Sequence, residues 1–250
     1  GHPVDMDPVL EVARKYNLVV IEDATESLGA RHKGRMVGAL GDIACFSFNG
    51  NKIITTGGGG MIVTDREEWA KKAKYLTTQA KDDLLEYVHN EIGYNYRLTN
   101  MQAAMGVAQL EQLDHYIEKK RRIAETYHGA LANVPGITCM QEADWAHSIF
   151  WMYTVLVDNE AYGRGHRQLL RHLSDSNIQT RPLWQPLHLS PAHGRFFSCS
   201  CHVAEKLQRN ALSLPCSALT APPPSAIGEQ ASRSMPRRSR PTATPSRAAT

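Results

Sequence analysis

The segment SFNGNKIITTGGGG, residues 47–60, contains a single lysine, Lys52, among small and uncharged side chains. A lysine amine becomes a nucleophile near neutral pH when desolvation or neighbouring positive charge favours its uncharged form. Such an amine adds to a carbonyl carbon and forms an imine. We therefore predict that Lys52 carries a cofactor as an imine, with the glycine-rich stretch beside it.

Pyridoxal phosphate is the main cofactor held in this way, and it needs further contacts: an acid beside its ring nitrogen, a phosphate cradle, and groups at the ring face and phenolic oxygen. Asp23 ends the apolar run LVVIED, and ligands bind at the carboxyl ends of strands in open α/β sheets. Ala24 is small enough to lie against the ring, and Glu26 can reach the phenolic oxygen. Ser47 can donate to the phosphate, and Gly57–Gly60 allow close approach of the backbone.

Each of these residues also has a plainer interpretation. An aspartate after an apolar strand often only caps a helix, and a single loop lysine is usually solvated. Four glycines form a flexible turn, and a glycine run without a following helix is not a phosphate-binding fingerprint. Spacing alone therefore leaves the cofactor unproven.

The elements around these residues alternate between helix and strand. GHPVDMDPVLEVARKY predicts a helix capped by Asp7, with Pro8 at its first position. LVVIED, IACFSF and MIVTD predict strands, and the unbroken apolar run of the first fits a strand covered on both faces. A long helix is predicted from Thr99 or Asn100 to about residue 131, with a recurring apolar stripe of Met101, Ala104, Met105, Ala108, Leu110, Leu113 and Ile117.

Further along, IFWMYTVLVD predicts a strand, RGHRQLLRHLSDSN an amphipathic helix, and IQTRPLWQPLHLSP a strand followed by a proline-bounded loop. The order predicts an α/β protein with part of a larger cofactor-binding domain over residues 1–115 and a smaller α+β domain over 116–218. Residues 219–250 are rich in proline, serine, alanine and arginine, and we expect them to be disordered. We also expect the sheet to begin before Gly1 in a longer protein, and we interpret the basic tail as a non-native or frame-altered terminus.

Composition argues against several other classes of protein. The net charge of +3 is concentrated in residues 217–250, so the rest of the chain lacks the basic face of a nucleic-acid-binding protein. The 5 cysteines do not suggest a disulfide framework, and Cys199 and Cys201 are too close together for a zinc pair, so we expect no metal. No run approaches the ~18 apolar residues of a membrane span. These features favour a reduced, cytoplasmic setting.

Three blocks carry a family resemblance: VVIEDATESLGA, GDIACFSFNGNKIITTGGGGMIVTD and GYNYRLTNMQAAMGVAQLEQLD. They resemble the DegT-type nucleotide-sugar aminotransferases, pyridoxal-phosphate enzymes with the aspartate-aminotransferase fold (fold type I). The resemblance runs from Gly1 to about Thr220. TTQAKDD, EYVHNEIGYNYRLTN and the all-glycine loop are most similar to the legionaminic-acid-type branch, which aminates C4 of a UDP-linked 4-keto-6-deoxy-N-acetylhexosamine for surface glycans such as lipopolysaccharide.

The resemblance implies a role for each candidate residue. Lys52 becomes the imine-forming lysine and proton shuttle, and Asp23 the partner of the ring nitrogen. Glu26 matches the position that contacts the phenolic oxygen, and Ser47 matches a phosphate contact. Many relatives have glutamate at the position of Gly58, so a carboxylate is absent here.

The resemblance also implies an assembly and a substrate site. Asn95 matches a residue that reaches the phosphate of the neighbouring subunit's cofactor, which implies a homodimer with shared active sites. Trp184 and His188 match a segment near the sugar, although core packing is an equal interpretation of Trp184. The implied reaction takes an amino group from an amino acid, usually glutamate in this family, and gives it to the keto sugar.

Alternatives remain open from the sequence. The sugar is unresolved, with GDP-linked 4-keto-6-deoxymannose or a 3-keto sugar as rivals, while Lys52 argues against a dehydratase that uses histidine. A non-catalytic fragment is a second possibility, favoured by the missing first block and the altered tail. Nucleic-acid binding through the arginine-rich tail is a third, which predicts salt-sensitive binding.

Overall fold

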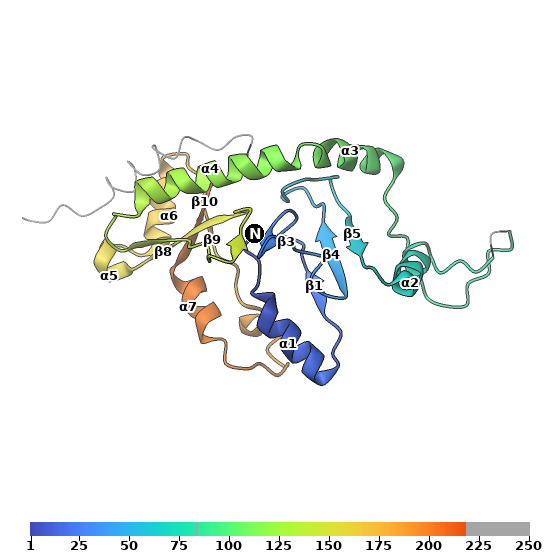
Figure 1. The fold of residues 1–250 in the computed structure, drawn as a ribbon. Helices are drawn as coiled ribbons and strands as arrows, with labels where there is room; N and C mark the ends of the chain where they lie inside the picture. The colour runs from blue at the N-terminus through green and yellow to red at the C-terminus, as the bar shows by residue number, and fades with distance from the viewer. Residues whose placement is uncertain (84, 219–250) are drawn as a thin grey trace, which may run out of the picture. The chain divides into compact units, whose positions relative to one another are not determined.

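The computed structural model describes residues 1–83 and 85–218 (Figure 1). The predicted disordered tail, residues 219–250, lies outside the described residues. The elements are, in chain order, α1 (Met6–Tyr16), β1 (Ile21–Asp23), β2 (Arg31–His32), β3 (Arg35–Met36), β4 (Ile43–Ser47), β5 (Gly60–Val63), α2 (Glu67–Thr77), α3 (Asn100–Leu110), α4 (Leu113–Leu131), β6 (Ile137–Cys139), β7 (Ala146–His147), β8 (Tyr153–Val157), α5 (Asn159–Tyr162), α6 (His166–Asp175), β9 (Arg181–Pro182), the 3-10 helix η1 (Leu187–Leu189), α7 (His202–Asn210) and β10 (Ala211–Leu214).

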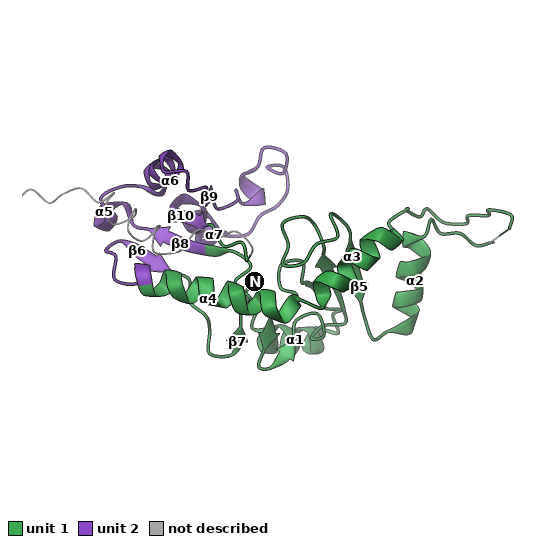
Figure 2. Cartoon of the chain, turned by 90° about the horizontal axis from the view of Figure 1, so that it is seen from above, with its two compact units in different colours: residues 1–129, 140–153, 215–222 green, residues 130–139, 154–214, 223–250 purple. Residues whose placement is uncertain are grey.

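The described chain divides into two compact units (Figure 2). Unit 1 comprises residues 1–129, 140–153 and 215–218, and unit 2 comprises 130–139 and 154–214. Unit 1 contains the sheets β1-β4-β5 and β3-β2-β7, while the sheet β6-β8-β10-β9 belongs to unit 2. In the part of the chain that the structure describes, no helix combines the length and apolar character that crossing a membrane requires.

The first sheet of unit 1 brings the ends of two strands together. β1 runs parallel to β4 with Asp23 opposite Cys45, and β4 pairs antiparallel with β5 with Ser47 opposite Gly60. Because parallel strands end at the same edge of a sheet, the loops that follow β1 and β4 begin side by side. These are the loops that carry the candidate site residues.

The prediction that LVVIED is covered on both faces is wrong. Leu18, Val19 and Ile21 are 57%, 57% and 69% exposed, because the described chain leaves the face of this segment that carries Val19 and Ile21 largely uncovered. The buried residue of β1 is charged: Glu22 is 7% exposed.

Glu22 holds a neighbouring turn through its carboxylate. Its two oxygens accept backbone N–H groups from Gly38, Leu40 and Gly41 at 2.8, 2.7 and 2.6 Å. Hydrogen bonds to an ionised acceptor are the strong ones, and a buried donor left unsatisfied costs its full desolvation. The carboxylate therefore joins β1 to the chain that leads into β4.

We expect Glu22→Gln to destabilise the protein by about 2 kcal/mol, because an amide loses the charge and turns one N–H₂ donor toward backbone donors. Urea unfolding followed by circular dichroism measures the loss. Glu68→Gln, on the exposed face of α2, is the matched control and should leave the midpoint unchanged. Equal midpoints for both variants would contradict this role of Glu22.

The cap of the first helix differs from the prediction. The Asp5 side chain accepts the backbone N–H of Asp7, so Asp5 and not Asp7 is the N-cap. Asp7 instead forms an ion pair with Lys33. Both carboxylates suit a helix start, and Asp7 lies within the first turn of α1.

The predicted long helix is two helices. Thr99 caps α3 through a capping box with Gln102, and a break after Leu110 precedes α4. The apolar stripe is buried only in α4, where Leu113 and Ile117 are each 8% exposed, whereas Met101 is 83% exposed. In the described chain α3 therefore leaves its apolar face uncovered.

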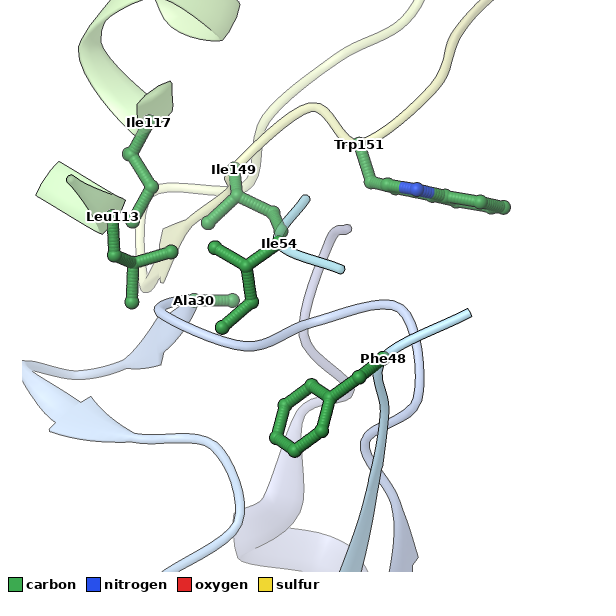
Figure 3. Packing of buried hydrophobic residues seen from close by; sticks show 7 residues of the cluster. All are labelled: Ala30, Phe48, Ile54, Leu113, Ile117, Ile149 and Trp151. Atoms are coloured by element: carbon green, nitrogen blue, oxygen red, sulfur yellow. The ribbon is translucent and has the colours of Figure 1, made fainter. Parts of the chain in front are cut away.

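A core cluster of unit 1 lies beside the lysine loop (Figure 3). It consists of Ala30, Phe48, Ile54, Leu113, Ile117, Ile149 and Trp151. Phe48 and Ile54 flank Lys52 in the sequence, so burial of these two side chains fixes both ends of the loop. The core thus restrains the position of Lys52.

The predicted strand IFWMYTVLVD is β8 from Tyr153 onward, with alternate residues buried as in a sheet with one covered face. The predicted amphipathic helix is α6, which buries His166, Leu169 and Leu173. The segment IQTRPLWQPLHLSP forms only the short strand β9 before its loop and η1.

Candidate active site

Lys52 is not a solvated loop lysine. Its Nζ donates to Glu26 Oε1 at 2.9 Å, and its side chain is 12% exposed against 43% for Glu26. Glu26 stands on the loop after β1 and Lys52 on the loop after β4. The sequence placed both residues in the site, but as contacts of a cofactor and not as partners of each other.

An aromatic side chain covers the same amine. The ring centroid of Trp151 lies 4.5 Å from Lys52 Nζ, and its indole Nε1 donates to Asn51 O at 2.9 Å. A cation over an indole face is favourable, and the hydrogen bond holds the backbone beside Lys52. Figure 3 shows the Trp151 ring at the margin of the core cluster.

Sequence reasoning missed Trp151. The residue lies in IFWMYTVLVD, which predicts a strand, and its contact with Asn51 spans 100 positions. No local pattern signals a contact of that separation. The nearest signal is the density of aromatic residues in the segment, which predicts burial but not its partner.

The loop itself is closed by backbone hydrogen bonds. Phe48 N donates to Gly59 O at 2.9 Å, Thr56 N to Phe48 O at 3.0 Å, and Lys52 N to Asn49 O at 3.0 Å. The two ends of the loop are therefore tied to each other. Lys52 projects from a closed turn and not from a flexible linker.

The glycines of the run differ in whether the backbone requires glycine at their position. Gly59 has φ +88°, a conformation that side-chain-bearing residues rarely adopt, and a Cβ there would lie 2.5 Å from Leu98 Cδ2. Gly58 has no positive φ, and a Cβ there would meet no atom within 4 Å. The fold thus requires glycine at position 59 and tolerates a side chain at position 58.

We expect Gly59→Ala to cost roughly 1–2 kcal/mol of unfolding free energy, since the new Cβ is strained at this φ. Gly58→Ala should stay within about 0.5 kcal/mol of the parent chain. Thermal unfolding of the two variants under identical conditions measures the difference. Losses of similar size at both positions would show that the loop is not built as described.

Asp23 ends β1 and is exposed. Its Oδ1 accepts from Thr25 N at 3.2 Å and from Thr25 Oγ1 at 2.7 Å, so the residue does cap a turn. Among the described residues Oδ2 has no hydrogen-bond partner. Ala24, by contrast, is 1% exposed, and its N–H donates to Cys45 O at 3.0 Å.

Ser47 and Asn95 stand in different surroundings. Ser47 ends β4, where its Oγ accepts from Asn49 N at 3.3 Å. Asn95 is exposed in the segment between α2 and α3 and forms an isolated bridge with Thr78. Within the described chain, no hydrogen bond joins Asn95 to the residues around Lys52.

Trp184 and His188 belong to unit 2. Trp184 is 61% exposed, so the interpretation as a core residue is wrong. His188 Nε2 lies 3.1 Å from Glu205 Oε1, and Arg209 lies 2.6 Å from the other carboxylate oxygen. The hydrogen bond from His188, with the charge of Arg209, lowers the pKa of Glu205.

The donors on the loops after β1 and β4 suit the chemistry of pyridoxal phosphate. Lys52 offers an amine for an aldehyde, Asp23 a free carboxylate oxygen for a ring nitrogen, and Ser47 a hydroxyl for a phosphate. Glu26 adds a carboxylate within hydrogen-bond distance of the amine. All four lie at the carboxyl edge of the sheet, where α/β proteins bind ligands.

Comparison with known proteins supports the same cofactor. Residues 1–224 match the DegT/DnrJ/EryC1/StrS aminotransferase family. The chain is 41% identical to a GDP-perosamine synthase of Caulobacter vibrioides over 86% of this chain and 58% of that protein. It is 32% identical to a UDP-4-amino-4,6-dideoxy-N-acetyl-beta-L-altrosamine transaminase of Campylobacter jejuni, with the same shares of 86% and 58%.

Solved structures agree with this match. The crystal structure of DesV of S. venezuelae in complex with a ketimine intermediate superposes with a TM-score of 0.82 at 32% identity, covering 93% of this chain and 62% of DesV. The chain spans between 48% and 58% of the length of the curated relatives first matched. The chain belongs to the DegT/DnrJ/EryC1/StrS aminotransferase family, whose members have the pyridoxal-phosphate fold type I and depend on that cofactor.

Proposed function

We propose that this chain supplies the lysine-bearing site of an aminotransferase that moves an amino group from an amino acid to a nucleotide-linked 4-keto-6-deoxy sugar. The observation that carries the proposal is the environment of Lys52. Its amine is withdrawn from solvent, paired with Glu26 and covered by Trp151, at the ligand-binding edge of the sheet. The family match to aminotransferases supports the reaction class.

Each residue has one task in this proposal. Pyridoxal phosphate, when bound, supplies a protonated ring that stores the electron pair released at the amino-bearing carbon. Lys52 would hold the cofactor and, once released as the neutral amine, would move a proton at that carbon, while Glu26 would keep this amine in place by accepting its hydrogen bond. Asp23 keeps a proton on the ring nitrogen through Oδ2. Ser47 donates to the phosphate, and Ala24 forms the floor under the ring.

The reaction then proceeds in two halves at one site. An amino acid, which we take to be glutamate, gives up its amino group and leaves as the keto acid. The keto sugar enters next and receives the amino group. Lys52 makes the proton transfer in both halves, so the same residue acts on the amino acid that donates the amino group and on the keto sugar that accepts it.

We further propose a homodimer with shared sites in the cytoplasm. Asn95 is exposed and extends from the segment before α3, which fits a role at the partner's cofactor phosphate. Trp184 and His188 are the candidates for contact with the sugar. Cys45, Cys199, Cys201 and Cys216 form no disulfide, which suits a reducing compartment.

Two nucleotide sugars are candidates for the acceptor. The motifs TTQAKDD and EYVHNEIGYNYRLTN favour the legionaminic-acid-type branch and hence a UDP-linked N-acetylhexosamine. The higher identity to a GDP-perosamine synthase, 41% against 32% for the UDP-sugar transaminase, favours GDP-linked 4-keto-6-deoxymannose as the second candidate.

A substrate panel tests the proposal. The purified full chain is supplied with pyridoxal phosphate, glutamate and either the UDP-linked or the GDP-linked keto sugar, and the products are identified by mass spectrometry. We expect one amino sugar nucleotide and an equal amount of 2-oxoglutarate. If the chain binds the cofactor on Lys52 but aminates neither sugar, the sugar assignment is wrong. If it does not bind the cofactor, the chain is a non-catalytic fragment.

A further inference from the structure

Lys120 and Cys216 form a buried pair outside the site just described. Lys120, on α4, is 8% exposed, and Cys216, after β10, is 7% exposed. The Lys120 Nζ donates to Trp151 O at 2.6 Å and to Cys216 O at 2.7 Å, and lies 3.4 Å from Cys216 Sγ. All of these atoms belong to unit 1.

The amine of this pair is unusual for a lysine. Its partners are two neutral carbonyls and a thiol, and no carboxylate among the described residues forms an ion pair with it. Burial lowers the pKa of Lys120, so the neutral amine is reached at lower pH here than in solvent. The neutral amine carries the lone pair that a new bond from nitrogen requires, and the thiol beside it is a group that peroxides oxidise.

We propose that Lys120 and Cys216 are a modification site at which a peroxide joins Nζ to Sγ through one bridging oxygen. In the first step, the thiol reacts with one peroxide and gives a sulfenic acid and water. In the second step, the amine and the sulfenic acid react with another peroxide, which yields the N–O–S bridge and two waters. The sulfur gives two electrons to the first peroxide, and the nitrogen gives two to the second.

The separation of the two atoms suits a bridge with an oxygen in it. At 3.4 Å, the space between Nζ and Sγ accommodates one bridging atom with a small movement of the lysine side chain, whereas a direct S–N bond requires a much larger approach. Two backbone hydrogen bonds already aim Nζ at this position. The bridge forms between groups that the fold holds together.

The bridge has a structural consequence. It ties α4 to the segment after β10, which are 96 positions apart in the sequence. A crosslink that closes a long loop restricts the unfolded chain, so the oxidised protein should unfold at a higher urea concentration. The bridged nitrogen keeps one hydrogen, so it can donate a hydrogen bond to only one of the carbonyl oxygens of Trp151 and Cys216.

The test is peptide mapping of the full chain after peroxide treatment, without reduction. We expect the peptides of Lys120 and Cys216 as one linked species that has gained one oxygen and lost two hydrogens, and that separates after treatment with dithiothreitol. Cys216→Ser and Lys120→Arg should each abolish the species. Cys139→Ser, which removes a thiol of similar burial (6% exposed against 7% for Cys216), should leave it unchanged.

Several outcomes would overturn the proposal. These are recovery of Cys216 as a free thiol, its recovery as an unlinked sulfinic or sulfonic acid, and a link that lacks the oxygen. Circular dichroism establishes which variants fold. Should Lys120→Arg fail to fold, the parent chain and the near-isosteric Cys216→Ser still decide the question.

Discussion

Lys52→Ala is expected to abolish amino transfer, with a loss of about a thousandfold or more, because the variant lacks both the amine that holds the cofactor and the base that moves the proton. The absorbance band of lysine-bound pyridoxal should disappear as well. Turnover of glutamate and keto sugar, followed by mass spectrometry, and the absorption spectrum with added cofactor measure the two effects.

The fold should survive this change. The ion pair between Lys52 and Glu26 involves a carboxylate that is 43% exposed, and pairs open to solvent contribute only about 0–1 kcal/mol. Loss of activity in a normally folded variant would therefore result from the missing amine and not from unfolding. Lys74→Ala, on the exposed surface of α2, is the control and should keep both the band and the turnover. An active Lys52→Ala variant would remove Lys52 from the mechanism.

Asp23→Asn is expected to reduce turnover roughly a hundredfold while changing the stability by less than about 1 kcal/mol. The amide keeps an oxygen that accepts from Thr25, so the turn after β1 is retained. It cannot hold a proton on a ring nitrogen as a carboxylate does. The catalytic loss thus exceeds the structural loss.

Steady-state kinetics and urea unfolding on the same preparation separate these effects. Asp65→Asn, at an exposed position after β5, serves as the matched control and should behave as the parent chain does. If Asp23→Asn is as active as the control, the carboxylate has only the capping role that its bonds to Thr25 already show.

The elements that the sequence predicted best are those with local signals. Thr99 is the N-cap of α3, and the residues after it predict this cap. The strands β4 and β5 lie within runs of β-branched and apolar residues. The helix α6 shows a clear amphipathic period. Such features depend on neighbours within a few positions, which the sequence displays directly.

The errors arise where distant residues decide. Asp5 caps α1 while Asp7 pairs with the distant Lys33, and the exposure of Ile21 depends on whether another element packs on its face of β1. The capping preferences allow either aspartate as the N-cap of α1. An apolar run has the same sequence whether or not another element packs on the strand that it forms. The domain boundaries placed at residues 115 and 218 remain predictions.

The residues of the candidate site also differ in whether a local sequence pattern predicts them. Lys52 and Glu26 stand out by residue type and their place after strands, and the structure brings them together. Trp151 and Glu22 do not, because each acts through contacts far along the chain. A residue that supports a site from another segment has no local signature, and only the folded chain reveals it.

The most direct measurement is the position of covalent capture. The full chain is incubated with pyridoxal phosphate, reduced with borohydride, digested and mapped by mass spectrometry. We expect a pyridoxyl group on Lys52, with the exposed lysines of α2 labelled no more than in the unfolded chain. Capture at other lysines while Lys52 stays unmodified, or no capture at all, would contradict it.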